Sequence, residues 1–221
     1  FTKLAVRGIL FYMIFKIQTF EDPILEKLYN QALEELREFF QFRWEKNTPK
    51  LIVVEDRNTI NAVYGKPTEN WMVAWAEDTR NIFILSRENY EKYSSHKYSE
   101  DEFYKLIKHE LSHMFYKLIT FTDKPRWVNE GISTYISGQL DSTKPIQEFK
   151  VFLNYFDKTD AELYKESGYL IKLLTDKFGK DKLSTFIKSL KGVKDQESAS
   201  KVFFDTFGLE LTYAELNKLL S

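Results

Sequence analysis

The sequence predicts an α+β protein, with a small mixed β-sheet and packed helices in its first half and helices alone in its second. Short β-branched and aromatic segments, bounded by turn residues, occur up to about residue 85. From about residue 99 onward, apolar residues recur with helical periodicity. The 221 residues, 43% of them hydrophobic, suffice for one large domain or two small lobes that share a cleft.

Charge and cysteine content exclude several kinds of site. The 32 basic and 33 acidic residues leave a net charge of -1, so no basic excess favours a nucleic-acid partner or an anionic membrane. Cysteine is absent, which excludes disulfides and cysteine-ligated metals. We therefore expect any metal in this protein to be held by histidine and carboxylate side chains.

The first 20 residues are strongly apolar. Leu4–Phe20 is predicted to be a buried strand or helix, two alternatives that periodicity does not separate. Its apolar run Ile9–Phe15 ends at Lys16, too short to span a bilayer, and no small-residue cleavage site follows, so we expect a core element. The chain begins with Phe1 rather than Met, as in a processed or trimmed chain, and its compartment and oligomeric state stay open.

One helix and three strands are expected before residue 86. Pro23 opens the helix, in which apolar residues recur at Ile24, Leu28, Ala32, Leu36 and Phe39 or Phe40. Leu51–Val54 is a β-branched strand. Trp71–Ala76 and Asn81–Leu85 are two further strands, joined by a turn over residues 77–80.

A second helix begins after a polar loop, Ser86–Ser99, that contains His96. Ser99 and Glu102 have the spacing of a capping box, which predicts the helix start. One face of this helix carries the apolar stripe Phe103, Ile107, Leu111, Met114 and Leu118. His109 and His113 lie together away from the stripe. The stripe can therefore pack on the sheet while the histidines face a second lobe.

The rest of the chain is predicted to be helical. Pro125 precedes a helix over about Trp127–Leu140. The later helices are expected at about Lys144–Asn154, Asp160–Phe178, Asp181–Lys191, Glu197–Phe207 and Thr212–Leu220. Gly179, Gly192 and Gly208 stand where helices should stop. The predicted division is a sheet-containing lobe over residues 1–122 and a helical lobe over residues 123–221, which together form one compact unit.

The chemistry is concentrated in His109-Glu110-Leu111-Ser112-His113, an H-E-x-x-H pattern. Two imidazoles four residues apart on a helix point the same way and can hold one metal ion. Glu110 lies close enough to take a proton from a water molecule on that metal. A catalytic zinc site needs a third protein ligand, either a carboxylate or His96. The best candidate is Glu130, seventeen residues after His113 near the start of the next helix.

Together with Trp127-Val128-Asn129-Glu130-Gly131-Ile132-Ser133-Thr134-Tyr135, this pattern resembles the gluzincin zinc metallopeptidases of the peptidase-MA clan, and is most similar to the M1 aminopeptidase catalytic domain. The resemblance spans about Leu106–Ser137. It implies a zincin-like fold, one Zn²⁺ held by His109, His113 and Glu130, and Glu110 as general base. It also implies a tyrosine that stabilises the oxyanion. Tyr164, in Tyr164-Lys165-Glu166-Ser167, is the candidate for that tyrosine and Tyr169 is the reserve.

One motif of the aminopeptidases is incomplete. Their G-x-M-E-N sequence binds the substrate amine, whereas this chain has Lys66-Pro67-Thr68-Glu69-Asn70-Trp71. We therefore treat Glu69 as an ordinary loop carboxylate and favour an endopeptidase that acts on peptide or protein substrates. The strand Trp71–Ala76 could pair with an extended peptide. The alternatives are an aminopeptidase and, in a different class, a catalytically silent metallopeptidase-like binding or regulatory domain.

Overall fold

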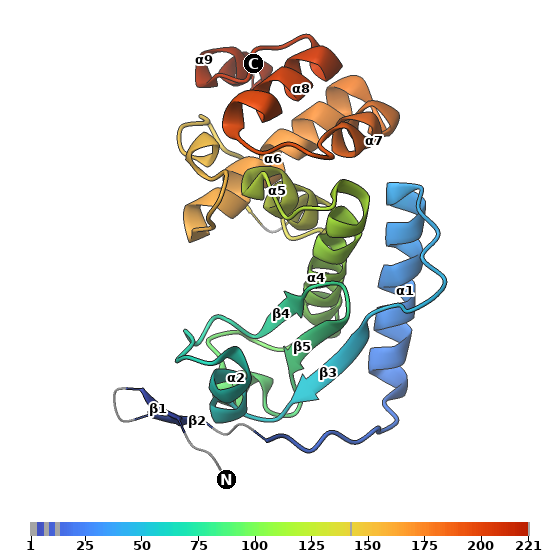
Figure 1. Ribbon diagram of the computed structural model, residues 1–221, viewed down its shortest axis with the longest axis vertical. Helices are drawn as coiled ribbons and strands as arrows, with labels where there is room; N and C mark the ends of the chain where they lie inside the picture. Colours follow the sequence, from blue (N-terminus) through green and yellow to red (C-terminus); the bar gives the residue numbers. More distant parts are fainter. Residues whose placement is uncertain (1–3, 7–8, 12–13, 142, 221) are drawn as a thin grey trace.

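The computed structural model describes residues 4–6, 9–11, 14–141 and 143–220, and for residues 4–6, 9–11 and 161 it describes the backbone alone. Figure 1 shows a lower part built around a small sheet and an upper part built from helices. The long helix α4 (Glu100–Thr120) lies between the two parts. The α+β class predicted from the sequence is thereby confirmed. A single cluster of buried hydrophobic side chains extends through both parts, from Leu25 to Leu216.

The sheet in the first half has three strands in the order β3-β5-β4. Strand β3 (Lys50–Val54) is parallel to the central strand β5 (Asn81–Leu85), and β4 (Ala74–Glu77) is antiparallel to β5, so the sheet is mixed, as predicted. Strand β4 begins at Ala74 rather than at the predicted Trp71, because the Met72 N–H bonds to the Glu69 carbonyl in a turn. Strand β4 is an edge strand of the described sheet.

The N-terminal residues depart from the prediction. They form an antiparallel hairpin of β1 (Leu4–Val6) and β2 (Ile9–Phe11), and an extended segment then runs along the lower edge of the molecule to α1 (Figure 1). The side chains of Ile14, Phe15, Ile17 and Phe20 are between 43% and 71% exposed. The predicted core element over Leu4–Phe20 is therefore wrong for these four residues, because residues 14–20 form neither strand nor helix and have no apolar face to bury. The side chains of residues 4–13 lie outside the described part.

The predicted first helix is confirmed as α1 (Pro23–Phe40), whose first turn is capped by the Asp22 carboxylate. Two short helices were not predicted. Helix α2 (Arg57–Tyr64) has an Asp56 cap but only 8 residues, and Ile60 is its single buried residue. Helix α3 (Tyr90–Tyr93) interrupts the loop that was expected over residues 86–99.

Helix α4 begins where the sequence predicts. The Ser99 hydroxyl accepts a hydrogen bond from the Glu102 N–H. The predicted apolar stripe contains four buried side chains, namely Phe103, Ile107, Leu111 and Met114, and the half-buried Leu118. Helix α4 packs against α1 and the sheet, as the ring of Phe115 shows by stacking on that of Phe40 at 5.4 Å. These contacts fix the direction in which the opposite face of α4 points.

The second half is helical, with one correction. It contains α5 (Arg126–Ser137), α6 (Ala161–Phe178), α7 (Lys180–Ser189), α8 (Gln196–Phe207), α9 (Tyr213–Leu216) and the 3₁₀ turn η2 (Asn217–Leu220). The helix predicted over Lys144–Asn154 is absent from the described residues 144–151, and only the 3₁₀ turn η1 (Phe152–Asn154) forms there. Pro145 disfavours helical backbone at the residue before it. The Glu166 carboxylate also accepts bonds from three successive N–H groups, at residues 150–152, in place of helical carbonyls.

Helices α5 and α6 approach each other closely at Gly131. A Cβ atom added at Gly131 would lie 2.7 Å from the backbone oxygen of Ser167 on α6. Only glycine therefore allows this spacing, which brings Tyr164 on α6 near Glu130 on α5. Across the described ranges, none of the helices is both long and apolar enough to cross a membrane.

Candidate metal centre

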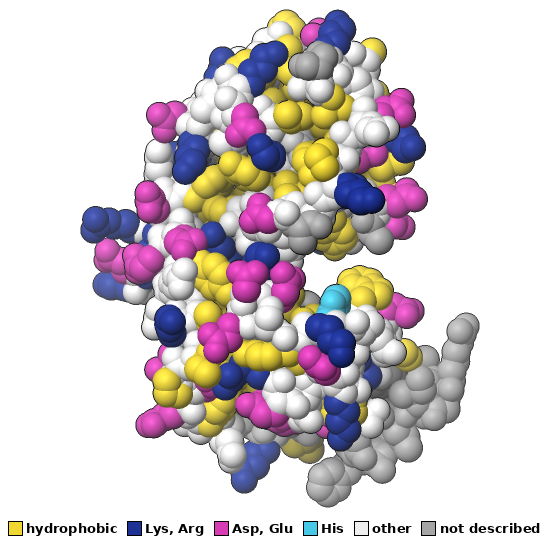
Figure 2. Space-filling view, turned by 180° about the vertical axis from the view of Figure 1, so that it is seen from behind, with side chains coloured by type: hydrophobic (Ala, Val, Ile, Leu, Met, Phe, Trp, Pro, Cys, Tyr) yellow, Lys and Arg dark blue, Asp and Glu magenta, His cyan; other side chains and the backbone are white. Residues whose placement is uncertain are grey.

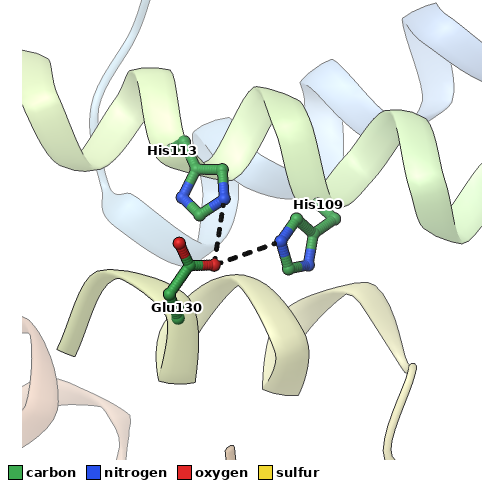
Figure 3. A group of neighbouring side chains, drawn as sticks. All are labelled: His109, His113 and Glu130. Carbon is green, nitrogen blue, oxygen red and sulfur yellow. Dashed lines mark ion pairs between the residues drawn. The ribbon is translucent and has the colours of Figure 1, made fainter. Parts of the chain in front are cut away.

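Two helices bring the predicted metal ligands together. His109 and His113 project from successive turns of α4, and Glu130 projects toward them from α5 (Figure 3). The imidazole rings are nearly perpendicular, with centroids 4.7 Å apart. The ligand atoms of all three residues lie within 4.8 Å of one another. This group could hold a metal ion.

The distances within the group suit a shared ion better than direct hydrogen bonds. One carboxylate oxygen of Glu130, Oε2, lies 3.5 Å from His109 Nε2 and 3.3 Å from His113 Nε2. Good N–H···O bonds measure about 2.7–3.2 Å, so both contacts are long. Two ligands bound about 2.1 Å from one tetrahedral zinc ion lie about 3.4 Å apart, which matches both separations.

Burial supports the same conclusion. The side chains of His109, His113 and Glu130 are at most 18% exposed. Glu130 Oε2 is buried and has no hydrogen-bond partner within the described part of the chain. Leaving a charged oxygen buried and unsatisfied is costly, and a bound cation removes that cost. The residues present therefore fit a divalent metal, with two nitrogen ligands and one oxygen ligand.

A second layer of polar groups orients His113. Its Nδ1–H donates to the Asn129 side-chain oxygen at 2.8 Å, and the Ser133 hydroxyl lies 3.1 Å from the same nitrogen. The Asn129 amide in turn donates to the Asp123 carbonyl. With Nδ1 as the donor, Nε2 is left as the lone-pair nitrogen that faces Glu130. The corresponding Nδ1 of His109 is buried without a partner among the described residues.

Sequence reasoning did not assign these supporting roles. From the sequence, Asn129 could either shape the helix start or touch substrate, and Ser133 had no role. The spacing carries a signal, because Asn129 and Ser133 are four residues apart and so share one face of α5. Glu130 directly follows Asn129, so one turn of α5 supplies both the ligand Glu130 and the orienting group Asn129.

The charges in the group are strongly coupled. Burial works to lower the pKa of His113, but the Glu130 carboxylate outweighs it and raises that pKa to about 9. Burial likewise works to raise the pKa of Glu130, but His113 and His109 hold it well below its usual range. Glu130 is therefore ionised at neutral pH, and in the metal-free protein a proton on His113 balances its charge.

The group opens onto a cleft of about 660 Å³ between the sheet-bearing and helical parts (Figure 2). Glu110 is only 8% exposed and lines this cleft beside both histidines. Tyr164 also lines it, and its ring centroid is 6.1 Å from that of His109. Burial, with the nearby carboxylates of Glu130 and Glu110, raises the pKa of Tyr164 well above its usual value, so its hydroxyl stays protonated and can donate.

Three further residues considered from the sequence do not join the ligand group. His96 borders the same cleft, but its Nε2 bonds to the Trp71 carbonyl at 2.9 Å, and it is not one of the three grouped ligands. The Tyr169 hydroxyl donates to the Thr143 carbonyl, and neither Tyr169 nor Glu69 is among the described residues that line the cleft. The geometry therefore groups Tyr164, and not Tyr169, with Glu110 and the three ligands.

Comparison with known proteins adds one relative. The chain is 30% identical over 133 residues to the uncharacterized protein YhcO of Bacillus subtilis strain 168. The match covers 53% of this chain and 39% of the relative, so the chain spans about two fifths of that protein's length. No family model matches the chain. No solved structure matches it either.

Proposed function

We propose that this protein is a zinc-dependent metallopeptidase of the gluzincin type, with a zincin-like fold. The observation that carries the proposal is the convergence of His109, His113 and Glu130 at distances suited to one ion. In this proposal His109 and His113 supply two nitrogens and Glu130 one oxygen. When bound there, zinc supplies the Lewis acidity that makes water nucleophilic near neutral pH.

Glu110 is the general base in this scheme. Glu110 directly follows His109 on α4. It lines the same cleft as the histidines but is not one of the three grouped ligands. The carboxylate accepts a proton from the attacking water and later donates it to the nitrogen of the leaving amine. Its low exposure keeps bulk water from competing for that proton.

Tyr164 supplies the hydrogen bond to the developing oxyanion. Its hydroxyl keeps its proton because its pKa is raised by burial and by two carboxylates. A protonated hydroxyl donates to the carbonyl oxygen of the scissile peptide as negative charge builds up on that oxygen. The alternative, Tyr169, is already engaged with Thr143, which supports the assignment of Tyr164.

Edge strand β4 supports an extended polypeptide as the substrate. Residues 73–76 line the cleft, and β4 pairs with β5 on one side only within the described sheet. Its outer backbone groups can pair with a peptide strand laid across the cleft. Glu69, which would be needed to hold a free amine, is not among the described residues that line the cleft. This placement favours an endopeptidase over an aminopeptidase.

The test combines metal content with hydrolysis of casein, with and without a chelator. We expect about one zinc per chain and cleavage that stops when the metal is removed. Glu110→Gln should retain the metal and lose activity by about 10²–10⁴-fold, because it removes general-base catalysis. Activity restricted to aminoacyl reporters with a free amine would instead indicate an aminopeptidase. Stoichiometric zinc without hydrolysis of any peptide would indicate a binding or regulatory domain.

A further inference from the structure

A single guanidinium fixes the loop that leads into edge strand β4. Arg57, at the start of α2, donates to the backbone carbonyls of Glu69, Asn70 and Met72 at 3.0, 3.2 and 2.6 Å. It also donates to the Tyr93 carbonyl at 2.6 Å, at the end of α3, where the next loop begins. Arg57 therefore acts as a clamp that joins two loops, and it does so through carbonyl acceptors rather than a carboxylate partner.

The same two loops are joined at a second place. His96 Nε2 bonds to the Trp71 carbonyl at 2.9 Å, and the Ser95 N–H bonds to the Asn70 carbonyl at 3.3 Å. The carbonyls on both sides of Trp71, and its own, are therefore all held by hydrogen bonds. The backbone of Trp71 has a defined position in the wall of the cleft.

Although its backbone is held, the Trp71 side chain is 59% exposed. Trp44 and Trp127, in contrast, are at most 7% exposed. Burial of a large aromatic ring is strongly favourable, so an exposed ring on a fixed backbone marks a surface suited to a ligand. Tyr64, 41% exposed, lines the same cleft and makes an edge contact with the Trp75 ring at 5.6 Å. The sheet side of the cleft thus has an aromatic wall formed by Tyr64, Trp71 and Trp75.

Four of the charged side chains that line the cleft form two ion pairs of opposite charge. Asp78 pairs with Lys117 at 2.8 Å. Asp123 pairs with Arg126 at 2.9 Å. Because each pair neutralises its own charge, neither pair selects for a charged substrate side chain, and the aromatic rings offer apolar contact instead.

We propose that this aromatic wall is a specificity subsite for an aromatic or large apolar side chain of a polypeptide, and that Arg57 is its positioning residue. The inference rests on the proposed peptidase function for the identity of the substrate. Trp71 precedes β4 by only a short stretch of chain, so a peptide paired with β4 can carry one side chain to the wall. Because the clamp fixes the wall before binding, little ordering is required when that side chain arrives.

The test uses quenched peptides in which a single Phe is placed in turn at each position around the cleaved bond, with Ala in the matched peptide. We expect kcat/KM to favour Phe over Ala at one position, and Trp71→Ala to reduce that ratio by about tenfold. Arg57→Lys keeps the charge but loses the fork of donors, and should reduce the same ratio mainly through KM. Phe204→Ala removes an exposed ring on α8, far along the chain, and should leave the ratio unchanged. A Phe preference that survives Trp71→Ala, or no Phe preference at any position, overturns the proposal.

A binding measurement separates failure of the subsite from failure of the peptidase proposal. Fluorescence anisotropy of labelled Phe and Ala peptides is measured with Glu110→Gln protein, with and without Trp71→Ala. If the wild-type protein cleaves no peptide but Trp71→Ala still lowers the Phe preference in binding, the peptidase proposal fails and the subsite stands. If peptides are cleaved and neither assay responds to Trp71→Ala, the subsite fails and the peptidase proposal stands.

Discussion

The close packing of α5 against α6 predicts that Gly131→Ala destabilises the protein. An added Cβ would lie 2.7 and 2.9 Å from the backbone oxygen and carbon of Ser167, and 3.0 Å from a side-chain carbon of Ile171. Two of these three neighbours are backbone atoms of a packed helix, so α6 itself must move. Overpacking of this kind costs about 1–3 kcal/mol, and the better helix propensity of Ala returns about 1 kcal/mol. We expect a net loss of up to about 2 kcal/mol.

Gly168→Ala is the matched control, because it makes the same substitution in the facing helix. Its added Cβ would meet only side-chain atoms of Thr134 and Leu140, at 3.0 to 3.3 Å, and these can rotate away. The propensity gain is the same in both variants and cancels, so they should differ mainly by the cost of about 1–3 kcal/mol for moving backbone atoms at Gly131. For a chain of this size, 1 kcal/mol shifts the melting temperature by about 2–4 °C, so Gly131→Ala should melt about 2–12 °C lower than Gly168→Ala.

The same variant also connects packing to function. The metal ligands lie on α4 and α5, whereas Tyr164 lies on α6. Moving α6 away from α5 should therefore lower kcat and leave zinc affinity nearly unchanged. Thermal unfolding, zinc titration and peptide hydrolysis of the two glycine variants test this. Equal melting temperatures for the two variants would refute the argument from backbone contact.

Three further predictions concern the ligand group. Glu130→Ala should weaken zinc binding, and unchanged affinity in a zinc titration would mean that another group is the third ligand. Asn129→Ala removes the acceptor for His113 Nδ1–H and should lower zinc affinity by about 10–100-fold. The third prediction follows from the pKa of His113, raised from 6.5 to about 9 in the metal-free protein. Below about pH 6.5 the ion pair of protonated His113 with Glu130 adds about 3 kcal/mol to the free energy of unfolding. This contribution is lost as the pH rises to about 9. Because the pKa of Glu130 is lowered, its contribution is present above about pH 4.5 and is lost on acidification. Denaturant unfolding in the presence of a chelator at pH 6 and pH 9 measures the fall in the free energy of unfolding. Glu130→Ala should abolish this difference between the two pH values.

The parts of the site that the sequence predicts are those set by local geometry. His109 and His113 share a face of α4 because they are four residues apart, and Ser99 begins that helix through a local hydrogen bond. Glu130 could be proposed because a known motif contains a glutamate in the same surroundings. Each of these inferences uses residues close together in the chain, where the spacing determines the direction in which the side chains point.

The parts that the sequence does not predict depend on partners distant in the chain. Arg57 donates to the backbone carbonyls of residues 69, 70, 72 and 93. Every residue has a backbone carbonyl, so the sequence does not indicate which of them an arginine will bind. Glu166 prevents the helix predicted over residues 144–154 by accepting bonds from three backbone N–H groups. The apolar residues Ile14, Phe15, Ile17 and Phe20 satisfy the pattern of a core element, yet they lie exposed because their segment forms neither a strand nor a helix with one apolar face.

Three sets of contacts hold the parts of the site, and they share few residues. The ligand group and Asn129 join α4 to α5, Gly131 sets the distance from α5 to α6, and Arg57 holds the loop before β4. Mutations at well-separated sites have nearly additive effects. Glu130 and Gly131 are neighbours on α5, whereas Trp71 lies in the loop before β4. Substrate selectivity should therefore change independently of metal binding: Trp71→Ala alters the first and Glu130→Ala the second. A Trp71→Ala variant that also lost zinc affinity would indicate global loosening of the fold, because separate contacts predict separate effects.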